Sequence, residues 1–147
     1  MSNETKTQRI TVAAFILRSD GTFLVGERAV DEAFLPGYLE LIGGGSKWGE
    51  NPQDALIREV KEESGLDVEV DAPLMTIMYT MGDVHRVMIV FLCTPIGNDS
   101  PKPSAEHSRL FWVSRSELSN YRTDDFMNRV VQESVAHIQR LGITVAE

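Results

Sequence analysis

The chain has 147 residues, of which 42% are hydrophobic and 24% charged, and these values predict one globular domain, residues 1–147, with its own hydrophobic core. A formal net charge of −8 argues against broad electrostatic binding to nucleic acid or to an anionic membrane surface. The N-terminus is polar, no apolar run approaches the roughly 20 residues of a membrane span, and the single cysteine, Cys93, excludes an internal disulfide, so we expect a cytoplasmic protein without a secretion signal.

The first elements along the chain are expected to be two strands. Residues 10–18 form an apolar run of strand length, residues 19–21 (Ser-Asp-Gly) are a turn signal, and residues 22–26 are predicted to form the returning strand of a hairpin. Residues 28–37 are expected to be a loop that Pro36-Gly37 closes.

A short strand is predicted at residues 39–42, and it leads into three consecutive glycines, Gly43, Gly44 and Gly45. Glycine lacks a Cβ, so a glycine run allows the backbone to approach a ligand closely. We therefore expect a glycine turn at which substrate binds, and a merely flexible turn is the alternative.

A helix is predicted at residues 52–64. Asn51 is a favourable N-cap, and Pro52 suits the first helical position, where no amide hydrogen is needed. Asp54 places a negative charge in the first turn, and Gly65 is a typical C-terminal stop.

The predicted helix carries a group of acidic side chains. Glu59, Glu62 and Glu63 follow the spacing i, i+3 and i+4, so they project from one face, and Glu50 lies just before the helix. Apolar side chains that can bury against a sheet are expected on the other side: Leu56, Ile57 and Val60. Like charges at this spacing destabilise a helix by roughly 0.2–0.5 kcal/mol per pair, and Arg58 offsets only part of the repulsion. The cluster therefore indicates a site for a divalent cation that prefers oxygen ligands, Mg²⁺ or Mn²⁺, although a solvated acidic face would have a similar composition.

The glycines and the helix follow one spaced pattern, G-x5-E-x7-R-E-U-x-E-E-x-G-U, in which U is a bulky aliphatic residue. Its specified positions are filled by Gly44, Glu50, Arg58, Glu59, Val60, Glu62, Glu63, Gly65 and Leu66. This stretch resembles the Nudix box, the signature of hydrolases that act on nucleoside diphosphates linked to another group X. The resemblance implies an α+β or mixed α/β fold, the Nudix-type α/β/α sandwich with a mixed β-sheet flanked by helices.

The resemblance also implies roles for individual residues. Glu59, Glu62 and Glu63 would bind the metal, with Glu50 as a further ligand or as support. Arg58 would orient these carboxylates by charge-assisted hydrogen bonds.

The general base and the substrate contacts are less narrowly defined by the pattern. Glu59 and Glu106 are both candidates for the base, and a solvated loop charge is the alternative for Glu106. His107 can bond substrate or have a structural role. Contacts to substrate are expected from a glycine run, a cation and an aromatic side chain: Gly43, Gly44, Gly45, Arg28 and Trp48. The alternative for Arg28 is an ion pair with Glu27 or Asp31, and the alternative for Trp48 is packing or plain exposure. Two further aromatic residues, Phe34 and Tyr38, can stack on a base.

The chain after the helix is expected to alternate strands and loops. Residues 68–70 form a strand edge, and residues 74–81 and 86–94 form a hairpin across Gly82-Asp83. Cys93 lies in this apolar strand, which indicates a small buried side chain. Residues 95–105 are rich in proline, glycine and serine, and are expected to form a mobile loop.

The C-terminal part is expected to contain a strand at residues 110–113, a brief helical turn that a capping box at Ser114–Glu117 opens, and a helix that Thr123 caps and Gly142 ends. Apolar and small residues recur at helical spacing in this helix and predict its packing face: Met127, Val130, Val131, Ser134, Ile138 and Leu141. The two other histidines, His85 and His137, follow no pattern and are expected at the surface or in packing.

The expected function is Mg²⁺-dependent hydrolysis of the diphosphate linkage in a nucleoside diphosphate-X compound, with a nucleoside triphosphate as the leading substrate, as in MutT-like pyrophosphohydrolases. ADP-ribose and sugar nucleotides of the GDP-mannose type are alternatives within the same reaction class. A non-catalytic nucleotide-binding module would be expected to lack one or more box glutamates, and a plain structural domain would leave the acidic cluster unexplained. The partners are then a small nucleotide, with no nucleic acid and no membrane, for a monomer or a homodimer.

Overall fold

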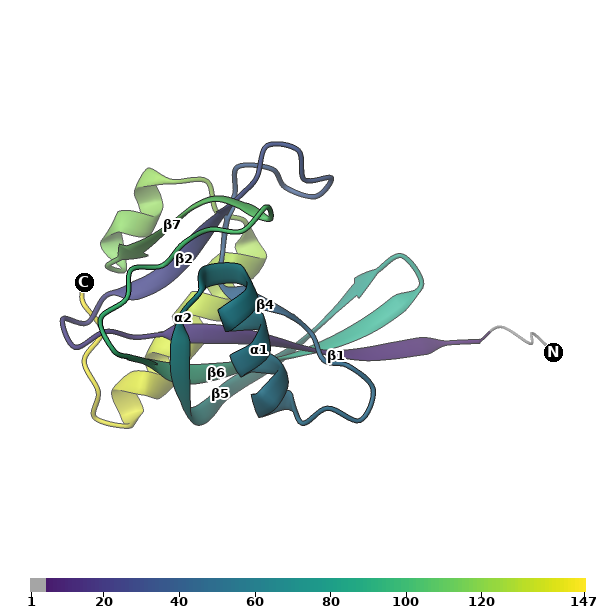
Figure 1. Cartoon of the computed structure of the whole chain (residues 1–147), viewed down its shortest axis with the longest axis horizontal. Helices are drawn as coiled ribbons and strands as arrows, with labels where there is room; N and C mark the ends of the chain where they lie inside the picture. Colours follow the sequence, from purple (N-terminus) through teal and green to yellow (C-terminus); the bar gives the residue numbers. More distant parts are fainter. Residues whose placement is uncertain (1–4) are drawn as a thin grey trace.

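The computed structural model describes residues 5–147 and contains two β-sheets, two α-helices and a short 3-10 helix (Figure 1). The elements are β1 (Thr7–Ile16), β2 (Phe23–Arg28), β3 (Leu39–Glu40), β4 (Ile42–Gly45), α1 (Pro52–Ser64), β5 (Asp67–Met81), β6 (Val84–Ile96), β7 (His107–Val113), the 3-10 helix η1 (Ser116–Asn120) and α2 (Asp125–Arg140). Part of the polar N-terminus, residues 1–4, lies outside the described residues. No helix within residues 5–147 is long and apolar enough to cross a membrane.

The larger sheet is mixed and has the strand order β4-β1-β6-β5. Strand β1 runs parallel to β6 and antiparallel to β4, and β5 and β6 form the long hairpin that the Gly82-Asp83 signal predicts. The smaller sheet is antiparallel, with the order β3-β2-β7. The predicted fold class, a mixed sheet flanked by helices, is confirmed.

Strand β1 separates two hydrophobic cores because its successive side chains point to opposite faces of the sheet. Val12 joins the core that Leu56 of α1 completes, and Phe15 joins the core that Val135 of α2 completes. The two helices therefore cover opposite faces of the larger sheet. Cys93 is fully buried in the α1 core, as expected, and burial raises the pKa of its thiol to about 12.

The predicted hairpin of residues 10–18 and 22–26 is wrong. The turn forms, since Asp20 Oδ1 accepts a hydrogen bond from Thr22 N at 2.9 Å, but β1 and β2 enter different sheets and meet only at the bridge Leu17–Phe23. The reason is that β4 and β6 already occupy the two hydrogen-bonding edges of β1, so β2 pairs with β3 and β7 instead.

The predicted glycine turn is also wrong, because the three glycines lie in strand β4. The register pairs Thr11 with Gly45, Val12 with Gly44 and Ala13 with Gly43. The single strand predicted at residues 39–42 is divided at Leu41, where the chain passes from the smaller sheet to the larger one.

Helix α1 has the predicted bounds and caps. The Asn51 side chain accepts a hydrogen bond from Gln53 N, and Gly65 has φ 74°, the left-handed conformation that glycine adopts readily. The predicted division into an acidic and an apolar face is correct for Leu56 and Val60, which are buried, but not for Ile57 and Glu63. Glu63 is buried on the same side as Leu56 and Val60, and Ile57, predicted to be buried, is 40% exposed. The reason is that the sheet meets the helix at the 56/60/63 side, from which residue 57 turns away.

Helix α2 begins one residue later than predicted. Asp124, not Thr123, is the N-cap, and its Oδ1 accepts a hydrogen bond from Met127 N at 2.8 Å. The predicted packing stripe is buried except for Leu141, which is 49% exposed because the helix ends at Arg140. The predicted capping box is formed in part, since Glu117 accepts hydrogen bonds from the backbone and the hydroxyl of Ser114.

Candidate functional site

Arg58 of α1 holds three carboxylates at once. Its guanidinium donates to both oxygens of Glu50, at 2.9 and 3.0 Å, to Glu59 Oε1 at 2.9 Å and to Glu62 Oε2 at 3.3 Å. The hydrogen bonds from Arg58 lower the pKa of Glu50 to about 2, so this carboxylate stays charged at neutral pH. The Arg58 guanidinium alone thus sets the orientation of three carboxylates in the acidic cluster.

The Glu59 carboxylate occupies the space that a side chain at position 44 would need. A Cβ added to Gly44 would lie 2.5 Å from the carboxyl carbon of Glu59. The glycine in this strand therefore allows α1 to bring an acidic group against the sheet. Burial raises the pKa of Glu59, and its ion pair with Arg58 opposes this effect.

Glu63 is the most deeply buried carboxylate of the cluster, with 4% of its surface exposed. One of its oxygens accepts a hydrogen bond from Gly43 N at 3.1 Å. Burial, followed by the hydrogen bond and negative charge of Glu106 and by the charges of Glu59 and Glu40, raises the pKa of Glu63 to about 10. At neutral pH this position therefore requires either a proton or a cation.

The chemistry of these donors fits a hard divalent cation. All are carboxylate oxygens, and the charge on Glu59 and Glu63 is only partly compensated by the protein. Within residues 5–147 no three acidic, histidine or cysteine side chains already converge as a metal cage. The reason is visible in the hydrogen bonds, because Arg58 draws the oxygens of Glu59 and Glu62 to itself.

A second polar network lies beside the first. Glu40 accepts hydrogen bonds from Arg28 Nη1 at 2.7 Å and pairs with His107 Nε2 at 2.8 Å. Burial acts against the charged form of Glu40, but its bonds to His107 and Arg28 outweigh burial and lower its pKa. The His107 ring is buried against Gly26, where an added Cβ would lie 2.6 Å from the ring carbon Cδ2. His107 therefore connects β7, and Glu106 just before it, to β2 and β3 of the smaller sheet.

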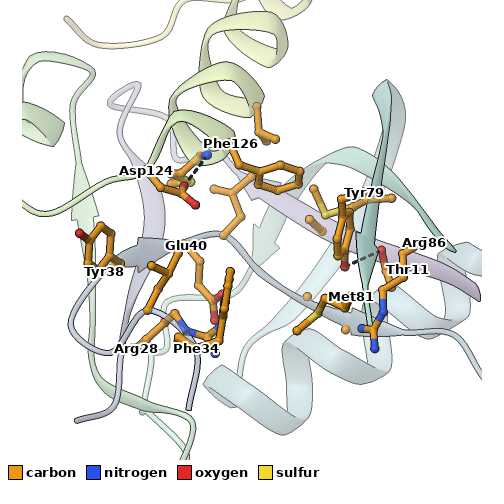
Figure 2. A pocket seen from close by; sticks show the side chains of 18 of the residues that line it. Thr11, Arg28, Phe34, Tyr38, Glu40, Tyr79, Met81, Arg86, Asp124 and Phe126 are labelled. Carbon is orange, nitrogen blue, oxygen red and sulfur yellow. Dashed lines mark hydrogen bonds and ion pairs between the residues drawn. The ribbon is translucent and has the colours of Figure 1, made fainter. Parts of the chain in front are cut away.

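A cavity of about 490 Å³ is lined by Arg28 and Glu40 of the second network and by the glycines of β4, which separate it from the carboxylates of the first. Figure 2 shows its walls, which come from segments far apart in the sequence. The labelled lining residues come from β1, β2 and the loop after it, β3, the β5–β6 hairpin and the start of α2. They are polar or aromatic except for Met81: Thr11, Arg28, Phe34, Tyr38, Glu40, Tyr79, Met81, Arg86, Asp124 and Phe126. This volume lies in the range of small-molecule sites.

The structure brings most of the predicted site residues together. Glu50, Arg58, Glu59, Glu62 and Glu63 form the cluster on α1, and Glu106 reaches Glu63 from the loop before β7. The glycines of β4 and Arg28 line the cavity, but the Arg28 guanidinium is already engaged by Glu40 and by Glu32, at 3.6 Å.

Trp48 is the exception among the predicted contacts. Its side chain is fully exposed, and it does not line the cavity, because the loop between β4 and α1 turns it toward solvent. Phe34 and Tyr38, the two other aromatic candidates for stacking on a base, do line it. His85 and His137 have the expected surface and packing positions: His85 pairs with Gln8 at 2.9 Å, and His137 with the carbonyl of Leu74 at 2.6 Å.

Sequence reasoning missed the far wall of the cavity, to which Tyr79, Arg86, Asp124 and Phe126 belong. A signal existed only for Arg86, a charged residue at the start of an otherwise apolar strand. The other three look like ordinary strand or helix-start residues until the fold brings them together.

The chain is similar to known proteins in sequence and in fold. A family model described as NUDIX domain matches residues 7–133. A MutT-like protein of Streptomyces ambofaciens is 32% identical over 122 residues, which cover 83% of this chain and 74% of that protein. The nucleoside triphosphatase NudI of Enterobacter sp. (strain 638) is 28% identical over 120 residues, 74% of this chain and 84% of that protein.

The crystal structure of the MutT protein from Methanosarcina mazei Go1 superposes with a TM-score of 0.77 at 23% identity and covers 95% of this chain and 99% of that chain. A UDP-X diphosphatase superposes with a TM-score of 0.75 at 17% identity, covering 99% of this chain and 70% of that chain. At these identities the solved structures support the fold alone.

Proposed function

Since this chain belongs to the NUDIX family and is a Nudix hydrolase, we propose that it is a Mg²⁺-dependent enzyme that hydrolyses the phosphoanhydride of nucleoside triphosphates. The curated relative named as a nucleoside triphosphatase supports this choice among the substrates of the family. Nudix hydrolases generally use divalent metal ions such as Mg²⁺, and the all-oxygen donor set of α1 is compatible with that ion.

One observation carries the proposal: the acidic cluster and the cavity share strand β4. Gly43 donates its backbone N–H to Glu63 on the α1 side, and Gly43, Gly44 and Gly45 also line the cavity. A nucleotide whose base enters the cavity would therefore have its phosphates beside the carboxylates. Neither the acidic cluster alone nor the cavity alone would favour a nucleotide over another anion.

The residues that would hold the metal are Glu59, Glu62 and Glu63, with Glu50 as a further ligand or as support. A divalent cation bound there supplies neutralisation of phosphate charge and a lower pKa for bound water. Glu59 and Glu62 would have to release Arg58 to take up this role, whereas Glu50 can keep its two hydrogen bonds to Arg58. Arg58 then positions the cluster without touching the substrate.

Glu106 is our preferred general base, and Glu59 is the second candidate. Glu106 is exposed, lies next to Glu63 and is fixed at its backbone, because its carbonyl accepts a hydrogen bond from Ala29 N at 3.0 Å. Its carboxylate would accept a proton from the attacking water. Glu59 is less suited to this task because Arg58 already holds one of its oxygens.

The test is a panel of nucleotides assayed for phosphate and pyrophosphate release with and without Mg²⁺. The panel contains the common nucleoside triphosphates, ADP-ribose and GDP-mannose. We expect Mg²⁺-dependent turnover, with the highest kcat/KM for a triphosphate. A higher kcat/KM for ADP-ribose or GDP-mannose would refute the substrate proposal, and nucleotide binding without any turnover would support a non-catalytic binding module instead.

A further inference from the structure

Two arginines face each other on neighbouring strands, which is an unfavourable arrangement unless something compensates it. Arg9 of β1 is in direct register with Arg86 of β6. Like charges directly opposite each other destabilise a sheet. The chain has 22 acidic and 14 basic residues, yet within residues 5–147 neither guanidinium forms an ion pair or a side-chain hydrogen bond. The protein thus leaves two cations together where carboxylates are abundant.

Arg86 is unsatisfied within the cavity wall. Its Nε is buried and, within the described residues, has no hydrogen-bond partner. Figure 2 shows the side chain at the end of the cavity that Thr11, Tyr79 and Met81 form, across from Arg28. A buried donor without a partner is costly to the folded state, so this donor is best explained by a ligand that supplies the acceptor.

Arg9 reaches the same edge of the cavity from the adjacent strand. A Cβ added to Gly45 would lie 3.1 Å from Nη2 of Arg9, so this guanidinium lies over the end of β4. Arg9 and Thr11 are two residues apart on β1, so their side chains point to the same face of the sheet. Both Thr11 and Gly45 line the cavity. The carbonyl of the same Gly45 accepts a hydrogen bond from Arg58 at 3.2 Å, so the arginine pair stands one strand away from the acidic cluster.

We propose that Arg9 and Arg86 form an anion-binding site that holds a phosphate group of the nucleotide at the rim of the cavity, apart from the carboxylates of α1. The planar guanidinium presents paired N–H donors that match phosphate oxygens. Neighbouring strands lie about 4.8 Å apart, so both side chains can reach one phosphate. The identity of the ligand as a nucleotide rests on the proposed function, whereas the affinity for phosphate depends on the arginines alone.

The test measures binding without metal, so that the acidic cluster does not contribute. AMP, GMP, CMP, UMP, the four nucleosides and inorganic phosphate are titrated calorimetrically in EDTA against the wild type, Arg9→Gln and Arg86→Gln. Arg140→Gln is the matched control, because it removes one positive charge from an exposed position at the far end of α2. We expect at least one monophosphate to bind about tenfold or more weakly to each of the two variants than to the wild type. Nucleoside affinity should not change, and Arg140→Gln should match the wild type.

Four results would overturn the proposal. Equal monophosphate affinity in the wild type and Arg86→Gln, or no monophosphate binding to the wild type, removes the site. A parallel loss of nucleoside and monophosphate affinity assigns Arg86 to the base instead. Inorganic phosphate that binds as tightly as the monophosphates makes the site one for free phosphate.

Two further measurements distinguish this proposal from a folding defect and from the proposed function. Arg86→Lys retains the positive charge and is the control for misfolding, and we expect it to bind the monophosphate more tightly than Arg86→Gln does. Arginine-dependent monophosphate binding by a protein that turns over no triphosphate would leave the anion site standing and refute the proposed function alone.

Discussion

The two sides of strand β4 differ in charge and in the elements that form them. On the α1 side, carboxylates are crowded against glycine backbone, and one arginine, Arg58, holds three of them. On the cavity side, aromatic side chains line the wall together with Arg86, and the exposed Arg9 lies over the end of β4 beside it. Neither arginine has a carboxylate partner among the described residues. The first side has an excess of negative charge. The second carries two arginines without ion pairs, whereas its carboxylate Glu40 is paired with Arg28, although the two sides are separated by a single strand.

This difference indicates that the two sides contact different parts of a bound nucleotide and affect different kinetic constants. The α1 side is suited to a metal ion and the chemical step, so changes there should reduce kcat. The cavity side is suited to the base and a phosphate group, so changes there should raise KM with little effect on kcat. Substitutions on the two sides therefore give a direct test of the comparison.

The largest effect is expected for Glu63→Gln, on the α1 side. The variant should lose roughly 100-fold or more in kcat, because a metal ligand contributes several kcal/mol to phosphoryl chemistry. It should remain folded, and in EDTA its melting temperature should equal or exceed that of the wild type, since a glutamine does not have to take up a proton to be buried. Steady-state kinetics and thermal melts measure both quantities. Glu69→Gln, at an exposed position of β5, is the control. Undiminished kcat would remove Glu63 from the metal site.

The next effect is expected for Gly44→Ala. The added methyl group would meet the Glu59 carboxylate at 2.5 Å and push it away from β4. We expect about tenfold lower kcat and a smaller melting-temperature shift on addition of Mg²⁺, because fewer carboxylates are positioned for the ion. Gly45→Ala is the informative comparison, because its methyl group would approach Arg9 and not a carboxylate. If both variants reduce kcat equally, the two sides of β4 are not distinct in function.

On the cavity side, Phe126→Ala should raise KM and leave kcat within about twofold. Phe126 lines the cavity and makes an edge contact with Tyr79, with ring centroids 5.3 Å apart. Loss of an aromatic surface that stacks on a base costs about 1–3 kcal/mol, so we expect roughly a tenfold increase in KM. A loss in kcat with unchanged KM would instead connect this side to the chemical step.

The charge on the α1 side also predicts how stability depends on pH without metal. Glu63 has a pKa of about 10 in the folded protein, above the ordinary carboxyl value of 4.5. Between these values the folded state binds a proton that the unfolded chain has released, so the free energy of unfolding falls as pH rises. Glu50, with a pKa lowered to about 2, has the opposite effect, which is confined to acid below pH 4.5.

We therefore expect the melting temperature of the wild type in EDTA to fall by several degrees more than that of Glu63→Gln between about pH 5.5 and pH 8.5. Added Mg²⁺ should reduce this difference. Parallel pH profiles of the two proteins would argue against a buried, uncompensated carboxylate at position 63.

The smallest effect is expected for Trp48→Ala. The side chain is fully exposed and lies outside the cavity, so kcat, KM and melting temperature should stay within about twofold or one degree of the wild type. A clear rise in KM would mean that the loop between β4 and α1 folds over the bound nucleotide.

The sequence by itself determined helix α1 and the order of its acidic residues. Its N-cap at Asn51, its proline start and its left-handed Gly65 are local features that act within one or two turns of the chain, and the structure reproduces the predicted bounds. The spacing of the glutamates within that helix is likewise fixed by the chain, so the pattern that relates this protein to its family can be recognised before folding is considered.

Only the tertiary structure decided which side of α1 meets the sheet, and therefore that Glu63 is buried beside Val60 while Ile57 is exposed. It also placed β2 in a second sheet, since both edges of β1 were occupied. It brought Arg86 and Phe126 to one cavity and paired Arg9 with Arg86 beside it. The physical reason is that burial and strand pairing depend on contacts between distant segments, and the local preferences of each segment are compatible with several such arrangements.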